Sequence, residues 1–161
     1  MVGILNAFKN QKFLIEIAKE LPEVTFLFVG EGPDRMNLEK KSKGFKNIIF
    51  AGHRTDIYKF YSAFDIFAFP SLYEGFPMVL VEAQCSGLNV IMNKTIDTTT
   101  QIVEQLCTAK PLEKEQWKKY IEHTPVLSNE RLLSKELQRF SIDENFKRLK
   151  ELYKKGLNDT K

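Results

Sequence analysis

The chain has 161 residues, of which 43% are hydrophobic and 28% are charged, which is enough apolar material for one ordinary globular domain. A formal net charge of +3 is too small to indicate a nucleic-acid-binding protein by itself, and no apolar run is long enough to predict a membrane span. The two cysteines, Cys85 and Cys107, have no metal-ligand spacing around them, so reduced thiols are favoured over a metal site. The chain shows no signal-peptide pattern and enters an apolar run at once, like the second half of a larger protein.

Strands and helices are expected to alternate along most of the chain. Five short apolar runs predict strands, at 2–5, 24–29, 48–51, 65–69 and 88–92. Helical patterns follow the first four of them, at 10–21, 34–42, 55–64 and 77–85. The second run is apolar almost throughout, which is typical of a parallel strand buried on both faces. Thr55 is placed to cap the third of these helices.

The alternation weakens toward the C-terminus. A last short strand is expected at 102–103. Three C-terminal helices are expected, at 113–122, 128–140 and 141–153. Ser141 and Glu144 form the pattern of a capping box at the start of the last one. Because short strands are followed by helices, the expected fold class is α/β, with a doubly wound parallel sheet, helices on both faces and extra C-terminal helices.

The most informative stretch is 70–87, which reads PSLYEGFPMVLVEAQCSG. Pro70 cannot continue a central strand because it has no N–H group to donate. Pro77 suits the first position of a helix, and Gly87 suits the left-handed residue that ends one. A helix therefore begins at the carboxyl end of the sheet, where its free N–H groups and partial positive charge can bind an anion.

Two further segments are expected at the same edge. Lys9 stands just before a helix start and could reach a phosphate, although a solvated lysine beside an Asn10 cap fits that loop equally well. Gly52, His53 and Arg54 follow the third strand, where their backbone groups or the guanidinium could line a pocket. An exposed turn is the favoured alternative there. His53 has no visible base or nucleophile partner, so it is not assigned a catalytic role.

Glu74 and Glu82 are the candidate carboxylates of the central stretch. An ionised carboxylate accepts hydrogen bonds from two vicinal hydroxyl groups, which suits it to gripping a sugar or a ribose. The neighbours of Glu82 make its helix apolar nearly all round, which predicts a buried helix and hence a partner or a cavity for the charge. The competing interpretation is an ordinary glutamate on a helix surface.

At these residues the sequence resembles the Glu-x7-Glu signature of retaining glycosyltransferases of family four, the group 1 family of GT-B fold. The signature begins at Phe69, contains Glu74 and Pro77, and continues to Glu82 and Gly87. Other matching segments occur in order at 9–16, 28–33 and 49–56. Ordered agreement over several blocks is far more specific than a lone motif. The chain looks most like the bacterial branch that builds capsular polysaccharides and exopolysaccharides.

The resemblance implies that residues 1–161 form the C-terminal, nucleotide-sugar-binding domain of a two-domain enzyme with Rossmann-like halves. The N-terminal acceptor domain would be absent from this chain, so the isolated domain is expected to bind a UDP- or GDP-sugar weakly and to be inactive. The complete enzyme would transfer a sugar, with retention, to a growing polysaccharide or a lipid-linked acceptor. No metal or other cofactor is implied, because a lysine and helix N–H groups neutralise the charge. A cytoplasmic location is implied, with contact at the inner face of the cell membrane left open.

The roles carried over residue by residue divide into catalytic and donor-binding ones. Lys9 would bind the donor diphosphate, and Glu74 would contact and orient the donor sugar. Glu82 would hold the ribose hydroxyls. The remaining donor-binding positions are Gly75 and Phe76, the helix start at Met78 and Val79 that would cradle the distal phosphate, and the base-binding turn of Gly52, His53 and Arg54.

Three positions depart from the family pattern. Ile4 stands where an arginine usually shares the diphosphate with the lysine, and Pro77 replaces a common glycine. The segment 93–101 lacks the usual glycine-rich sequence. Because the arginine is missing, a non-catalytic nucleotide-binding or interaction module of the same fold stays open.

A glycoside hydrolase and a membrane-binding C-terminus are less favoured interpretations. A hydrolase could use Glu74 and Glu82 as an acid and base pair, but their place beside a helix start and a lysine argues against it. The basic residues between 147 and 155 could contact a membrane, but interspersed glutamates favour a solvated face. The base, the sugar, the linkage and the acceptor do not follow from the sequence.

Overall fold

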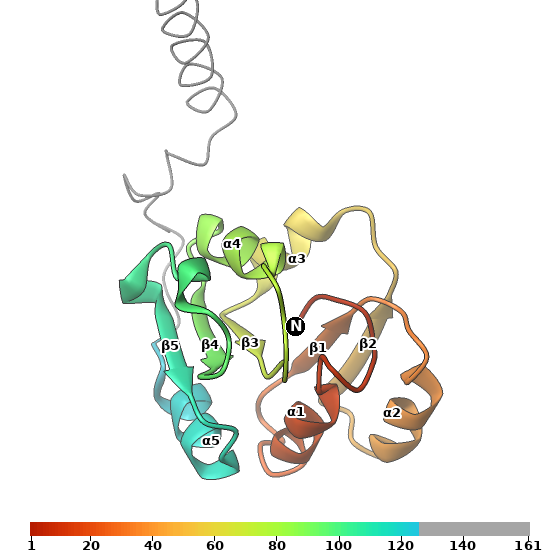
Figure 1. Ribbon diagram of the computed structural model, residues 1–161. Coiled ribbons are helices and arrows are strands. Elements are labelled where there is room, and N and C mark those ends of the chain that lie inside the picture. The colour runs from red at the N-terminus through yellow and green to blue at the C-terminus, as the bar shows by residue number, and fades with distance from the viewer. Residues whose placement is uncertain (126–161) are drawn as a thin grey trace, which may run out of the picture.

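A computed structural model describes residues 1–125 of the chain (Figure 1). The helices are α1 (Gln11–Ala18), α2 (Arg35–Lys41), α3 (Ile57–Ala63), α4 (Met78–Cys85) and α5 (Lys114–His123). The strands are β1 (Phe26–Val29), β2 (Ile48–Gly52), β3 (Ile66–Phe69), β4 (Asn89–Asn93) and β5 (Cys107–Lys110). The helices expected at 128–140 and 141–153, with the Ser141 and Glu144 pattern and the basic residues near the C-terminus, lie outside the described residues.

The strands form two parallel sheets. β1 pairs with β2, and β4 lies between β3 and β5. The first five residues run along β1, where Val2 forms a single parallel bridge with Val29 and the Gly3 N–H donates to the Val29 carbonyl at 2.9 Å. The strand expected at 2–5 is therefore reduced to one bridge, although the segment follows the path of a strand.

Helices cover both sides of the strands. Figure 1 shows α3 and α4 on one side and α1, α2 and α5 on the other. The contacts agree, since α1 touches α2, α5 and β1, whereas α4 touches β3 and β4. This is the doubly wound arrangement that the alternating pattern predicts.

The core lies between these layers and continues under α5. Val90, Ile91 and Met92 of β4 are fully buried, as expected for a strand covered on both faces. Trp117 of α5 is also fully buried, its indole N–H donates to the Pro111 carbonyl at 2.8 Å, and Phe13 of α1 meets it edge-on with the ring centroids 5.2 Å apart. The aromatic contact fixes α5 against α1.

The strand predicted at 102–103 is wrong, because the last strand is β5, which begins at Cys107. The side chain of Gln84 explains the error. Its Oε1 atom accepts hydrogen bonds from the backbone N–H groups of Ile102 and Val103, at 2.8 and 2.9 Å. These amides are satisfied by a buried side chain instead of a neighbouring strand, so the apolar pair forms a bend.

Several helix ends differ from the sequence expectations, and the largest difference is in α1, which was expected to reach residue 21 and ends at Ala18. α3 begins at Ile57 after Asp56, with no side-chain cap, so the capping role expected of Thr55 is wrong. α4 begins at Met78, one residue later than expected, with Pro77 in extended conformation before it. Its C-terminus is as predicted, because Gly87 has a φ of 68° and the Leu88 N–H donates to the Ala83 carbonyl at 3.1 Å.

Candidate functional site

The loops that follow the parallel strands meet at one edge, as the topology requires. Gly30, after β1, donates its N–H to the carbonyl of Gly52, the last residue of β2, at 2.8 Å. On the other side, the Leu72 N–H in the loop after β3 donates to the Phe8 carbonyl at 2.8 Å. The segment from residue 3 to residue 10 therefore lies between the loops of the two sheets and joins them into one rim.

Glycine is required where this rim is tightest. A Cβ atom at Gly30 would lie 2.1 Å from the carbonyl oxygen of Gly3, and one at Gly32 would lie 2.3 Å from that of Leu5. Both distances are far below any real contact, and the opposing atoms are backbone. The glycines on either side of Glu31 thus allow the loop after β1 to pack directly on the N-terminal segment.

Lys9 and Glu74 are brought together at the centre of the rim. The Lys9 Nζ atom lies 2.7 Å from Glu74 Oε1, and each side chain is only 15% exposed. The ammonium also lies 5.0 Å from the centroid of the Phe69 ring. Lys9 is therefore an ion-paired, largely buried cation and not a solvated lysine.

The backbone around Lys9 is fixed by Asn10, which does not have the capping role expected of it. Asn10 has a φ of 53° and makes no side-chain cap with α1. Its Nδ2 group donates instead to the Pro70 carbonyl at 3.3 Å, and the Lys9 N–H donates to Asn6 Oδ1 at 2.9 Å. These bonds anchor the lysine to the loop that carries Glu74.

The start of α4 is open, as an anion site requires. Met78 is 56% exposed and Phe76 is 53% exposed, and no atom lies within 4 Å of a Cβ placed on Gly75. Within residues 1–125, no protein acceptor pairs with the backbone N–H groups of Met78 or Val79. The first turn of this helix therefore presents unpaired donors and a partial positive charge.

Glu82 differs from the expectation of a buried carboxylate. α4 buries Leu80, Val81, Ala83 and Gln84, whereas Glu82 is exposed. The expectation of a partner is confirmed, because the Tyr61 hydroxyl of α3 donates to Glu82 Oε2 at 2.7 Å. In the described part of the chain, Glu82 forms no hydrogen bond or ion pair with Lys9 or Glu74.

The turn after β2 is exposed, and its arginine is already paired. Gly52 ends the strand with a φ of 70°, and His53 lies on the surface. The Nε and Nη2 atoms of Arg54 both donate to the carboxylate of Asp56 at 2.9 Å. The hydrogen bonds from Arg54 hold the pKa of Asp56 below its usual value. No contact joins this turn to Lys9 or Glu74 among the described residues.

Two residues that sequence reasoning missed also support the site. Tyr61 holds Glu82, as described above. Asn93, at the end of β4, is 3% exposed and its Nδ2 group donates to the Ser71 carbonyl at 2.9 Å. A polar residue that ends an apolar strand was a usable signal for Asn93, whereas nothing in the sequence pairs Tyr61 with Glu82.

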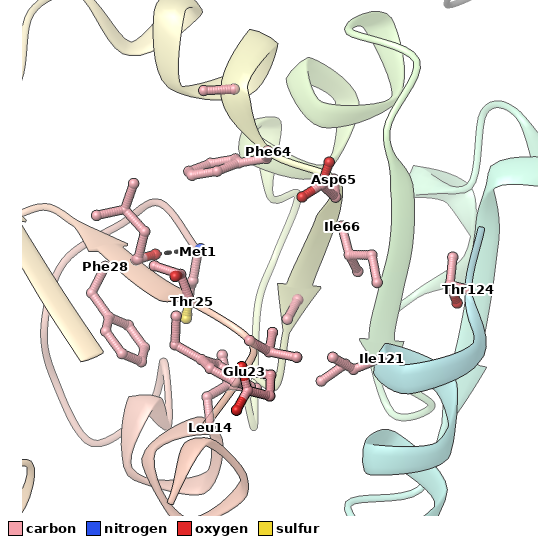
Figure 2. A pocket seen from close by; sticks show the side chains of 15 residues that line it. Met1, Leu14, Glu23, Thr25, Phe28, Phe64, Asp65, Ile66, Ile121 and Thr124 are labelled. Carbon is pink, nitrogen blue, oxygen red and sulfur yellow. Dashed lines mark hydrogen bonds between the residues drawn. The ribbon is translucent and has the colours of Figure 1, made fainter. Parts of the chain in front are cut away.

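A hollow of about 420 Å³ lies away from this rim, beside the first residues of β1 and β3 (Figure 2). Figure 2 shows its lining, which includes Leu14 of α1, Ile66 of β3 and Ile121 of α5. The Met1 α-amino group donates to the Leu27 carbonyl there at 2.9 Å, and burial lowers its pKa to about 5. None of the candidate site residues lines this hollow, so the charged rim is the candidate site.

In residues 1–125, no group of three or more His, Cys, Asp or Glu side chains is placed to hold a metal ion. No helix in this range is both long enough and apolar enough to cross a bilayer.

Comparison with known proteins assigns the family. The model of the family described as "Glycosyl transferases group 1" matches residues 1–123. The chain belongs to this family. EpsF of Bacillus subtilis (strain 168), named as a glycosyltransferase, is 36% identical over 122 residues, which cover 69% of this chain and 32% of EpsF. The UDP-Gal:alpha-D-GlcNAc-diphosphoundecaprenol alpha-1,3-galactosyltransferase of Escherichia coli is 34% identical over 103 residues, which cover 58% of this chain and 27% of that enzyme.

Solved structures confirm the fold class. The crystal structure of HepE from Anabaena in complex with UDP matches with a TM-score of 0.72 and 25% identity, over 95% of this chain and 48% of HepE. The chain thus has the α/β, Rossmann-like fold found in GT-B glycosyltransferases. It spans about a third of the length of the curated relatives above, 32% and 27%. Membership of family four and the C-terminal position stay predictions.

Proposed function

We propose that the chain is the donor-binding, C-terminal part of a retaining glycosyltransferase of family four. The observation that carries this proposal is the 2.7 Å pairing of Lys9 with Glu74 in the loop that leads to the open start of α4. A nucleotide-diphosphate sugar needs a cation and N–H donors for its phosphates, and a carboxylate for its hydroxyl groups. The rim of this chain offers all three.

In the proposed reaction, the bond between the anomeric carbon and the diphosphate oxygen breaks, and the acceptor oxygen bonds to the same face of the sugar. Lys9 and the N–H groups of Met78 and Val79 neutralise the charge that develops on the departing diphosphate. Glu74 accepts hydrogen bonds from the sugar and stabilises positive charge near the anomeric carbon. The acceptor proton leaves with the bond that forms, and we assign it to the departing phosphate oxygen.

The nucleoside is proposed to lie toward Glu82 and the turn after β2. Glu82 is exposed and its carboxylate is held by Tyr61, which leaves acceptor capacity for ribose hydroxyls. The Arg54 guanidinium is occupied by Asp56, so the backbone of Gly52 and His53 is the better candidate for reading the base.

The names of the relatives support a uridine nucleotide and a lipid-linked acceptor. The Escherichia coli relative is named for UDP-Gal and a diphosphoundecaprenol acceptor, and HepE was solved with UDP. We therefore propose UDP-sugar over GDP-sugar as the donor. Transfer to a lipid-linked or polysaccharide acceptor, at the cytoplasmic side of the membrane, is proposed for the complete enzyme and requires the acceptor half.

A hydrolase loses support from the geometry. Glu74 is engaged by Lys9, and Glu82 by Tyr61 of another helix, which fits separate binding roles better than an acid and base pair. One observation still supports the alternative, a non-catalytic nucleotide-binding module of the same fold. Ile4 occupies the place of the family arginine, and no second cation replaces it in contact with Glu74 among the described residues.

Calorimetric titration of the 161-residue chain with UDP tests the proposal. Lys9→Ala should weaken UDP binding about tenfold, a typical loss for a charge-assisted hydrogen bond. Lys12→Ala is the matched control, because Lys12 is exposed and lies on α1 beyond the rim. Equal affinity of the wild type and Lys9→Ala for UDP would remove Lys9 from the donor site.

A further inference from the structure

The contact between Tyr61 and Glu82 joins the interior of the chain to its surface. Tyr61 lies on α3 and is 4% exposed, whereas Glu82 lies on α4 and is exposed. The Tyr61 hydroxyl donates to Glu82 Oε2 at 2.7 Å, the usual length of an O–H···O hydrogen bond. A buried phenol thus holds one oxygen of a surface carboxylate.

The phenol itself is firmly held. Its ring meets Phe64 edge-on, with the centroids 6.2 Å apart, and lies against the fully buried Phe67 of β3, with the centroids 5.7 Å apart. Burial, followed by the charge and hydrogen bond of Glu82, raises the pKa of Tyr61 above its usual value. The hydroxyl therefore keeps its proton and acts as the donor.

This arrangement changes what Glu82 can do for a ligand. A carboxylate has two oxygens that each accept more than one hydrogen bond. Oε2 is occupied by Tyr61, and Oε1 has no hydrogen-bond donor among the described residues. An unrestrained surface glutamate would lose several rotamers when a ligand bound, and the bond to a fixed phenol removes that freedom in advance.

We propose that Tyr61 is a positioning residue that fixes the Glu82 carboxylate so that its open oxygen accepts hydrogen bonds from a vicinal diol, the ribose of a nucleoside diphosphate. The inference rests on the proposed function, because it assigns Glu82 to the nucleoside. Tyr61 contacts no ligand. It acts by presenting Glu82 in one orientation.

Tyr61→Phe tests the inference, because it removes the hydroxyl and keeps the ring. The 161-residue chain and the variant are titrated calorimetrically with UDP and with 2′,3′-dideoxy-UDP, which lacks the diol. We expect the variant to bind UDP about fivefold more weakly, a typical effect of one hydrogen bond, and to bind the dideoxy nucleotide as the wild type does. The preference of the chain for the diol should therefore fall about fivefold.

Two controls distinguish a loss of Glu82 positioning from a general loss of packing in the Tyr61→Phe variant. Tyr58→Phe changes a tyrosine of the same helix that is 67% exposed, and it should leave both affinities unchanged. In a Glu82→Ala background, Tyr61→Phe should cause no further loss of diol preference, because no carboxylate remains to be positioned. The ratio of the two affinities does not depend on the folded fraction, since both nucleotides bind the same folded molecules.

The outcomes separate this inference from the proposed function. Equal weakening of both nucleotides by Tyr61→Phe, or no weakening, would overturn the positioning role alone. A wild-type chain that binds UDP but does not prefer it over the dideoxy nucleotide would remove Glu82 from the ribose, and with it the role of Tyr61. A chain that binds no nucleoside diphosphate would overturn the proposed function as well.

Discussion

The two halves of the rim are built in different ways. Around β1 and β2, backbone packs on backbone, and the contacts depend on glycines such as Gly30 and Gly32, where a Cβ would overlap carbonyl oxygens. Around β3 and β4, side chains make the connections. Examples are Asn93 to the Ser71 carbonyl, Gln84 to the bend at 102–103, and Lys9 to Glu74.

The difference indicates that the half around β1 and β2 mainly supports the fold, whereas the half around β3 and β4 carries the candidate binding groups. Backbone contacts are rigid and carry no charge, so the β1 and β2 half can hold the N-terminal segment. Its arginines, Arg35 and Arg54, are already paired with carboxylates of the same half. Side-chain contacts can exchange partners, and the half around β3 and β4 contains the ion pair and the open helix start. Substitutions in the first half should therefore affect stability, and those in the second half should divide between stability and binding.

The largest effect is expected from Gly30→Ala. The new methyl group would lie 2.1 Å from the Gly3 carbonyl oxygen at a φ of 137°, so the N-terminal segment must separate from β1. We expect the free energy of unfolding to fall by more than about 3 kcal/mol, measured by urea denaturation.

Gly44→Ala is the matched control, because Gly44 has a φ of 91° and nothing within 4 Å of the added Cβ. It retains only the backbone strain, about 1–2 kcal/mol. Similar losses in the two variants would show that the close packing at Gly30 is not important.

The next effect is expected from Gln84→Met. The apolar side chain keeps the volume but leaves the N–H groups of Ile102 and Val103, and the Thr100 carbonyl, without their buried partner. A loss of about 2–4 kcal/mol is expected in the same denaturation experiment. Gln105→Met, at an exposed position of the same bend, should change stability by no more than about 0.5 kcal/mol. A stable Gln84→Met protein would mean that the bend is held by other contacts.

A smaller effect, on binding, is expected from Glu74→Gln. Removing the carboxylate frees Lys9 for the diphosphate, so UDP should bind up to about fivefold more tightly, as about 1 kcal/mol for an ion pair implies. Glu16→Gln breaks a pair with Lys19 on α1, away from the rim, and should leave the affinity for UDP unchanged. Weaker UDP binding by Glu74→Gln would indicate that Glu74 touches the nucleotide itself.

The smallest effect concerns the reactivity of Cys107, which follows the bend that Gln84 holds. Burial raises the pKa of this thiol to about 12. At pH 8 the reactive thiolate is rare in the folded protein, so alkylation should be at least about a hundredfold slower than in the denatured protein. The rate in the folded protein should rise with pH, because the thiolate is the reactive form. Rapid labelling at pH 8, followed by mass spectrometry, would show that the bend opens.

The fold could be predicted from the sequence because apolar runs and helical patterns report burial directly. The Glu74 loop and the C-terminus of α4 followed from Pro70 and Gly87, whose backbone preferences are local. The strand expected at 102–103 failed because a buried glutamine, distant in sequence, satisfies those amides. Local patterns cannot show such a partner.

The sequence predicted the residues of the candidate site but not the contacts between their side chains. The sequence placed Lys9 and Glu74 on neighbouring loops, and the structure supplies the ion pair. The apolar neighbours of Glu82 predicted that it is buried. In the structure, α4 buries those neighbours and places Glu82 on the surface. Its contact with Tyr61 joins two helices 21 residues apart in the chain, which a single sequence does not reveal.

Gly3 borders the lysine arm of the rim. A Cβ at this position would come within 3.5 Å of Lys9 Cε and 3.8 Å of Nζ, which are ordinary van der Waals contacts. The φ of 144° at Gly3, however, is one that residues with a side chain rarely adopt. A methyl group at position 3 would therefore be opposed by the backbone and not by crowding, so Gly3→Ala should lower stability while leaving room for the Lys9 ammonium.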